Sequence, residues 1–305
     1  MRRTGDQQGP TMTDQLLLVL KIAVSVATIG SLLELGLQLE FREALVGLRN
    51  LRFVILTLLW GFVLGPALAW LITWVLPLAE PYGIGLIVMS MVPCASYISL
   101  LVQRAGGDLR YSASFLLLTS FGMVLFIPFV LPALVTGVSV TSWDIGKPLL
   151  ILVLVPLMIG IAFHQLSRNS ALKLCPFIKK TSVIALVICL VTTVLLYAKG
   201  ILLSVGSLAL LSNMLFYVIL TAAAYASALG MPKTQKSVLS IGICSRNSGP
   251  AFATALSIPH LDGQVLVMCG LAILVQVSLS FFLANRFGRE AGTIIREGQD
   301  KSPKV

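Results

Sequence analysis

The segment GICSRNSGP, residues 242–250, places an arginine and several small polar residues inside an otherwise apolar stretch. Arg246 can donate hydrogen bonds to oxygen atoms, and Asn247 and Ser248 can donate to a carboxylate or sulfate group. The glycine and proline that follow favour a break in a helix. A charge near the centre of a membrane helix costs at least ~2.5 kcal/mol, so Arg246 must face a cavity or a partner.

Two interpretations of Arg246 fit the sequence. The guanidinium contributes to an anion pocket or replaces a bound cation, or else it forms a purely structural ion pair. Glu34 is the acid that lies well inside an apolar run, so it is the candidate partner for such a pair.

A second polar break lies in VPCASYISLLVQRAGGD, residues 92–108. Pro93 lacks a backbone donor, and Ser96 and Ser99 follow it closely. Backbone groups freed by a break inside a membrane must bind protein, water or an ion. Helix N-termini at two such breaks attract an anionic group, so we expect an anionic group of a substrate to bind between them.

Enzymatic chemistry has little support in the sequence. The patterns HExxH, GxSxG, GxGxxG and the Walker lysine motif are missing, and no close pair of carboxylates lies in an apolar run. Cys94 and Cys244 flank the two breaks and are candidate contacts for a metalloid oxyanion, although packing as small apolar residues is the alternative. We therefore predict that the protein is not an enzyme and has no resident cofactor.

The composition places these residues in a lipid bilayer. Of the 305 residues, 57% are hydrophobic and 11% are charged, about half the charged share of a soluble domain. Apolar runs long enough to cross a membrane recur along the chain, which predicts an all-α polytopic membrane protein with nine transmembrane helices. The predicted spans are 15–39, 51–77, 82–104, 109–136, 147–167, 181–198, 203–229, 235–257 and 261–286.

The two breaks fall in the third and eighth of these spans. Five positions in the order separate them, and an odd offset inverts topology, so the sequence predicts an inverted repeat with two discontinuous helices. No linker divides the chain, and residues 1–305 are expected to form a single transporter domain. The polar residues 287–305 are expected to form a frayed cytoplasmic tail.

The distribution of positive charge predicts the orientation. Sixteen of the 22 lysines and arginines fall in loops and ends on one side, which places the N-terminus outside and the C-terminus in the cytoplasm. This asymmetry accounts for the net charge of +10 without a nucleic-acid partner. The expected location is the inner (plasma) membrane of a bacterium.

Three segments resemble the bile acid:sodium symporter family: LGLQLEF at 35–41, the segment 92–108, and QKSVLSIGICSRNSGPAFATAL at 235–256. The resemblance implies a core domain, in which two unwound helices cross, and a panel domain. It also implies a nine-helix form that lacks the first helix of ten-helix members. Members carry organic anions such as bile salts, keto acids and pantoate, usually with sodium.

The resemblance also implies two sodium sites, from which this chain departs. At one site the family's acid corresponds to Gly242, and its glutamine corresponds to Arg246. At the other site only the hydroxyls of Ser99 and Ser112 remain. Sodium requires several oxygen ligands, so we expect its coupling to be reduced or lost, with Arg246 in the vacated cation place. Further departures are Gly61 for a glutamine, Ile98 for a serine and Leu116 for a threonine.

The predicted function is secondary transport of a small organic anion, bile-acid-, keto-acid- or pantoate-like, by alternating access. A metalloid oxyanion carrier of the same fold and a non-transporting membrane sensor are the alternatives. The predicted substrate-binding residues are Cys94, Ser96, Ser99, Arg246, Asn247, Ser248 and Gln276.

Overall fold

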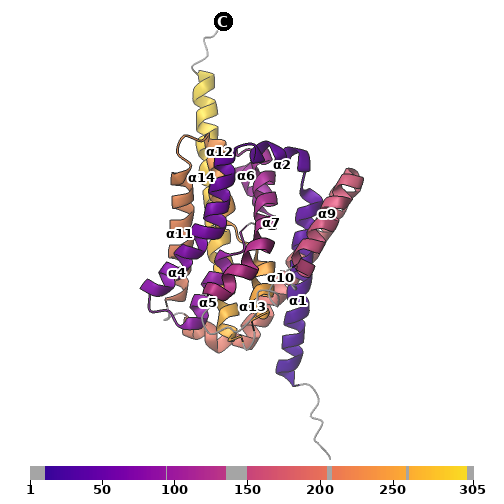
Figure 1. The fold of residues 1–305 in the computed structure, drawn as a ribbon, viewed down its shortest axis with the longest axis vertical. Helices are drawn as coiled ribbons and strands as arrows, with labels where there is room; N and C mark the ends of the chain where they lie inside the picture. Colours follow the sequence, from indigo (N-terminus) through magenta and orange to yellow (C-terminus); the bar gives the residue numbers. More distant parts are fainter. Residues whose placement is uncertain (1–10, 94, 135–149, 205–207, 259–260, 301–305) are drawn as a thin grey trace, which may run out of the picture.

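The computed structural model describes residues 11–93, 95–134, 150–204, 208–258 and 261–300, and within these ranges the secondary structure is helical, with no strand. Figure 1 shows the helices running mainly along the long axis of the molecule. The first helix begins at one end of this axis, and the last helix ends at the other. An all-helical fold agrees with the sequence prediction.

Five of the described helical segments are long and apolar enough to cross a membrane. The segment Ile151–Leu166 is apolar but shorter. The long segments are Met12–Gln38, Leu51–Val75, Arg168–Ala198, Ala209–Ser227 and Gly263–Gly292. This pattern is that of a polytopic membrane protein.

One group of helices packs around the first helix, α1 (Met12–Gln38). Its members α9 (Val155–Leu166) and α10 (Arg168–Ser204) contact α1 and each other, and the short π-helix η2 (Leu150–Leu154) leads into α9. A Cβ added at Gly160 of α9 would lie 2.6 Å from the carbonyl oxygen of Leu33, so α1 and α9 approach at backbone distance. We call α1, η2, α9 and α10 the α1 bundle.

The remaining helices form a second, larger group with most of the buried apolar side chains. Helix α2 (Phe41–Leu48) connects α1 to this group. Its helices are α3 (Leu51–Leu58), the π-helix η1 (Leu59–Leu64), α4 (Gly65–Val75), α5 (Glu80–Ser90), α6 (Ile98–Arg104), α7 (Leu109–Leu134), α11 (Ala209–Ser227), α12 (Lys233–Cys244), α13 (Ser248–Leu256) and α14 (Gly263–Asp300).

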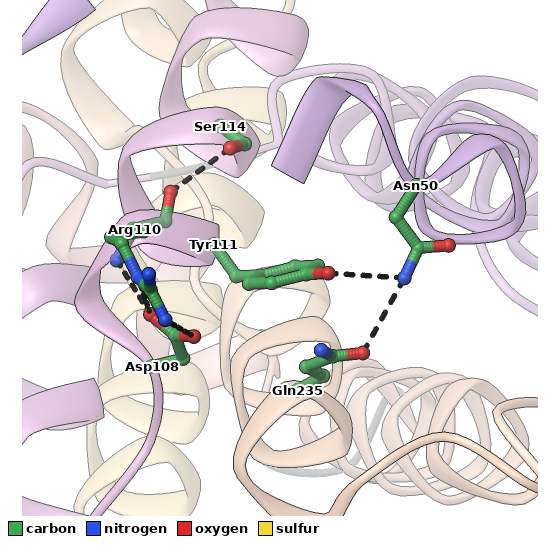
Figure 2. Close-up of polar contacts among 6 residues, drawn as sticks. All are labelled: Asn50, Asp108, Arg110, Tyr111, Ser114 and Gln235. Atoms are coloured by element: carbon green, nitrogen blue, oxygen red, sulfur yellow. Dashed lines mark hydrogen bonds and ion pairs between the residues drawn. The ribbon is translucent and has the colours of Figure 1, made fainter. Parts of the chain in front are cut away.

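A polar network joins the starts of α3, α7 and α12 (Figure 2). The Nδ2 of Asn50 donates to the hydroxyl of Tyr111 at 3.1 Å and to Oε1 of Gln235 at 3.5 Å, and its Oδ1 caps α3 at the amide of Phe53. Asp108, at the start of α7, forms an ion pair with Arg110 at 3.1 Å. These contacts hold together the starts of three helices that are far apart in the sequence.

Two helices extend beyond the predicted spans. Helix α10 begins at Arg168, before the predicted start near residue 181, because Ala171 and Cys175 on one face pack beside Leu37 of α1 while Lys173 and Lys180 remain exposed. Helix α14 continues to Asp300, where a frayed tail was expected after residue 286. The length of an apolar run in the sequence predicts the part of a helix that lies in lipid. It does not predict polar turns that continue the helix beyond the lipid.

Candidate functional site

Both predicted helix breaks are present, and they pair with each other. The first lies between α5 and α6, and the second lies between α12 and α13. Pro93 and Arg246 form an isolated antiparallel bridge, and the amide of Asn247 donates to the carbonyl oxygen of Val92 at 3.0 Å. Two segments 153 positions apart in the sequence therefore satisfy each other's backbone groups inside the protein.

Arg246 is fully buried at the second break, with 0% of its surface exposed. Its Nη1 donates to the carbonyl oxygen of Ser90, the last residue of α5, at 3.0 Å. The carbonyl end of a helix carries partial negative charge, which favours the guanidinium there. The guanidinium carbon also lies 5.8 Å from the centre of the Phe216 ring, a cation–π contact.

Gly65, the first residue of α4, makes room for the same side chain. A Cβ added at Gly65 would lie 3.2 Å from Nη2 of Arg246. The side chain therefore reaches from the second break across the end of α5 to the start of α4. Ser90, Gly65 and Phe216 were not predicted as neighbours of Arg246, since nothing in their local sequence marks them.

Gln276 of α14 braces the second break from the side. It is buried, with 1% exposed, and its Oε1 accepts from the backbone amide of Arg246. Its Nε2 donates to the hydroxyl of Ser248 at 3.2 Å. Sequence reasoning placed Gln276 at a substrate cavity, whereas in this structure both ends of its amide bind the break.

Asn247 and Ser248 lie together at the start of α13. Their exposed fractions are 5% and 7%. Asn247 is the N-cap residue of α13, but its side chain makes no capping hydrogen bond. The side-chain amide of Asn247 therefore does not bind the end of α13. The hydroxyl of Ser248 accepts a hydrogen bond from Gln276.

Ser96, in the first break, bonds to the α1 bundle. Its hydroxyl donates to Oε2 of Glu34 at 3.0 Å, and Nε2 of Gln38 donates to Oε1 of the same carboxylate at 3.0 Å. The ion pair of Glu34 is with Lys179 of α10, at 3.9 Å. The sequence left open an ion pair between Glu34 and Arg246. In the structure Glu34 instead contacts Ser96, Gln38 and Lys179.

The two hydroxyls predicted as remaining sodium ligands do meet, since the Oγ atoms of Ser99 and Ser112 lie 3.3 Å apart. At the other predicted sodium site, a carboxylate at position 242 would clash with apolar neighbours. A Cβ added to Gly242 would lie 2.6 Å from the Phe115 ring and 2.9 Å from Cδ1 of Ile98. Apolar side chains therefore fill the space that the family's acid would need.

The described cysteines do not take part in a cluster of metal-ligating side chains. Cys244 is fully buried, and its thiol lies 3.9 Å from the carbonyl oxygen of Gln276. Cys94 lies outside the described residues. Across the part of the chain that the structure describes, no three His, Cys, Asp or Glu side chains gather as metal ligands would.

Comparison with protein families matches residues 26–204 to the Sodium Bile acid symporter family. The match covers more than half of the chain, which therefore belongs to this family, as the sequence motifs predicted. It is accordingly an integral membrane protein of a transporter family. No curated protein matches the chain significantly in sequence. The match includes the first break, whereas the second break, with Arg246, lies beyond it.

Proposed function

We propose that the protein is a secondary transporter of a small organic anion that works by alternating access. Family membership supports transport. The observation that carries the proposal is the antiparallel pairing of Pro93 with Arg246, because two broken helices that meet at their breaks place polar backbone and one cation inside an apolar protein.

The proposed architecture has nine transmembrane segments. The α1 bundle corresponds to the panel, and the second group of helices corresponds to the core, with the discontinuous helices α5–α6 and α12–α13 in inverted halves. The start of α1 and the end of α14 lie at opposite ends of the molecule, which fits an odd number of crossings (Figure 1). The charge asymmetry supports an external N-terminus and a cytoplasmic C-terminus in an inner (plasma) membrane.

Sodium coupling is proposed to be reduced or lost. Phe115 fills the space beside Gly242, and the guanidinium of Arg246 places a permanent positive charge at the second break. A fixed cation that bonds to Ser90 holds the broken helices together without a bound ion. Ser99 and Ser112 alone offer two neutral oxygen atoms, too few for a hard cation.

The proposed anion site lies beside the breaks, where Asn247, Ser96 and Arg246 are the principal donors. The side chain of Asn247 makes no capping hydrogen bond, and the hydroxyl of Ser96 already donates to one carboxylate, that of Glu34. Apolar side chains around the breaks would accommodate the rest of an organic ligand. The further proposed contacts are Cys94, Ser99, Ser248 and Gln276, of which Ser248 and Gln276 also bind each other.

Uptake into proteoliposomes tests the proposal. Radiolabelled taurocholate, pyruvate and pantoate are supplied in turn, with sodium or choline as the external cation. We expect protein-dependent uptake of at least one anion that does not follow the sodium gradient. Binding of an anion without flux would instead indicate a sensor, and flux of arsenite or arsenate that thiol alkylation blocks would indicate a metalloid carrier.

A further inference from the structure

Glu34 is a buried acid, with 2% of its surface exposed, and it is the only Asp or Glu classed as buried among the residues that the structure describes. Both of its oxygen atoms accept hydrogen bonds, Oε1 from Gln38 and Oε2 from Ser96. A carboxylate in an apolar protein interior is costly unless it is paired, and such groups inside membrane helices mark functional positions.

Among the residues that the structure describes, the charged and titratable groups near Glu34 lie on two elements of its own bundle. From α10, Lys179 lies 3.9 Å from Oε1, and the thiol of Cys175 accepts from Gln38. From α9, His164 contacts the carbonyl oxygen of Leu37 through Nδ1. Helix α13 also packs on α1, but its sequence, SGPAFATAL, has no titratable side chain.

Helix α1 contacts both breaks. Glu34 bonds to Ser96 in the first break. At the second break, a Cβ added to Gly249 would lie 3.0 Å from Cα of Thr28, so α1 and α13 approach closely. A movement that shifts α1 relative to the first break would therefore separate Glu34 from Ser96.

The partners of Glu34 respond differently to such a movement. Gln38 and Lys179 belong to the α1 bundle and move with Glu34, whereas Ser96 stays with the breaks. The hydrogen bond between Glu34 and Ser96 is then present in the arrangement described here and absent in the arrangement that the movement produces. The hydroxyl of Ser96 binds a carboxylate more strongly than a neutral carboxylic acid, because the first bond is charge-assisted.

We propose that Glu34 is a proton-binding site whose occupancy controls the contact between the α1 bundle and the paired breaks. This inference rests on the proposed alternating movement. The charged carboxylate holds Ser96 and favours the arrangement described here, and protonation favours the arrangement in which Ser96 has left. A ligand that binds two conformations unequally shifts their equilibrium, and the proton does so here. A proton gradient can then drive the transport cycle in place of sodium.

The distance between two spin labels tests this inference without any organic anion. The labels are placed at Leu172→Cys of α10 and Leu109→Cys of α7, both exposed positions, in a chain whose native cysteines are alanine. Pulsed electron paramagnetic resonance measures the distance in lipid nanodiscs from about pH 5 to about pH 8. We expect the ratio of the two arrangements to change about tenfold across this range, as the loss of one charge-assisted bond predicts.

The variant Glu34→Gln, which resembles the protonated acid in shape, should hold the low-pH distance at every pH. Ser96→Ala should also remove the pH response. Glu290→Gln, at a more exposed acid of α14, is the matched control and should keep it. A pH-independent distance in the parent chain, or a pH response that survives in Glu34→Gln, would overturn the proton site.

Anion uptake distinguishes this inference from the proposed function. A pH-dependent distance with no uptake of any organic anion supports the proton site and counts against transport. Uptake with a pH-independent distance supports transport and rejects the proton site. In the coupled case, uptake of the active probe raises the internal proton concentration reported by pyranine, and Glu34→Gln abolishes this signal.

Discussion

Nη1 of Arg246 donates to the carbonyl oxygen of Ser90 at 3.0 Å, and it thereby joins the second break to the end of α5, 156 positions away in the sequence. The contact uses a group that every helix end leaves unpaired, namely a terminal carbonyl. In a membrane this carbonyl has no water to bind, so the arginine both neutralises the helix end and holds the two breaks together.

Arg246→Ala should therefore reduce stability strongly. It removes a hydrogen bond from a charged donor and leaves a cavity beside Phe216, which together cost at least ~2 kcal/mol. Thermal unfolding in detergent, followed by tryptophan fluorescence, measures the effect. Arg286→Ala is the control, because that side chain is 64% exposed and should change the free energy of unfolding by less than ~0.5 kcal/mol. Equal melting temperatures for the two variants would refute a bracing role for Arg246.

Sodium should not stabilise the protein. Replacing sodium by choline at constant ionic strength should leave the melting temperature unchanged, because Phe115 and Ile98 fill the space beside Gly242. Gly242→Glu should not restore a sodium response, and overpacking against the Phe115 ring should destabilise the protein by about 1–3 kcal/mol. A saturable rise in melting temperature with sodium in the parent chain would show that the site still binds the ion.

The sequence predicted the breaks better than their contacts. Proline and glycine beside small polar residues act locally, so Pro93 and the segment from Arg246 to Pro250 marked both breaks correctly. The family match confirms the membership that the motifs indicated. The partners of Arg246 and Glu34 were not predictable, because Ser90 is an ordinary small residue in a distant segment and because nothing in the sequence linked Ser96, predicted as an anion contact, to Glu34. The nine-span count remains a prediction, because five of the described segments are long and apolar enough to cross a membrane and each half of the two broken helices is too short to be recognised as a span by length.

Gly160→Ala should loosen the α1 bundle. The added Cβ would lie 2.6 Å from the carbonyl oxygen of Leu33 and 2.9 Å from Cα of Gly36, and backbone atoms cannot move aside without separating α1 from α9. We expect a loss of about 1–3 kcal/mol in the free energy of unfolding. Gly292→Ala is the matched control, since no atom lies within 4 Å of the added Cβ and alanine favours a helix by up to about 1 kcal/mol. If both variants gained stability, the two helices would not approach at backbone distance.

Substitutions at Asn247 distinguish a contact with substrate from a structural role. An N-cap side chain that bonds to its helix costs about 0.5–2 kcal/mol when it is replaced by alanine. Asn247 makes no such bond, so Asn247→Ala should leave the melting temperature nearly unchanged while the affinity for a transported anion falls about tenfold, as the loss of one hydrogen bond to a charged group predicts. Asn247→Asp has nearly the same shape, but a carboxylate in its place would repel the anion, so it should bind more weakly still. Uptake measured over a range of probe concentrations gives these affinities. Equal affinities in the parent chain and both variants would remove Asn247 from the anion site, because a side chain that touches the anion must respond to the change of charge.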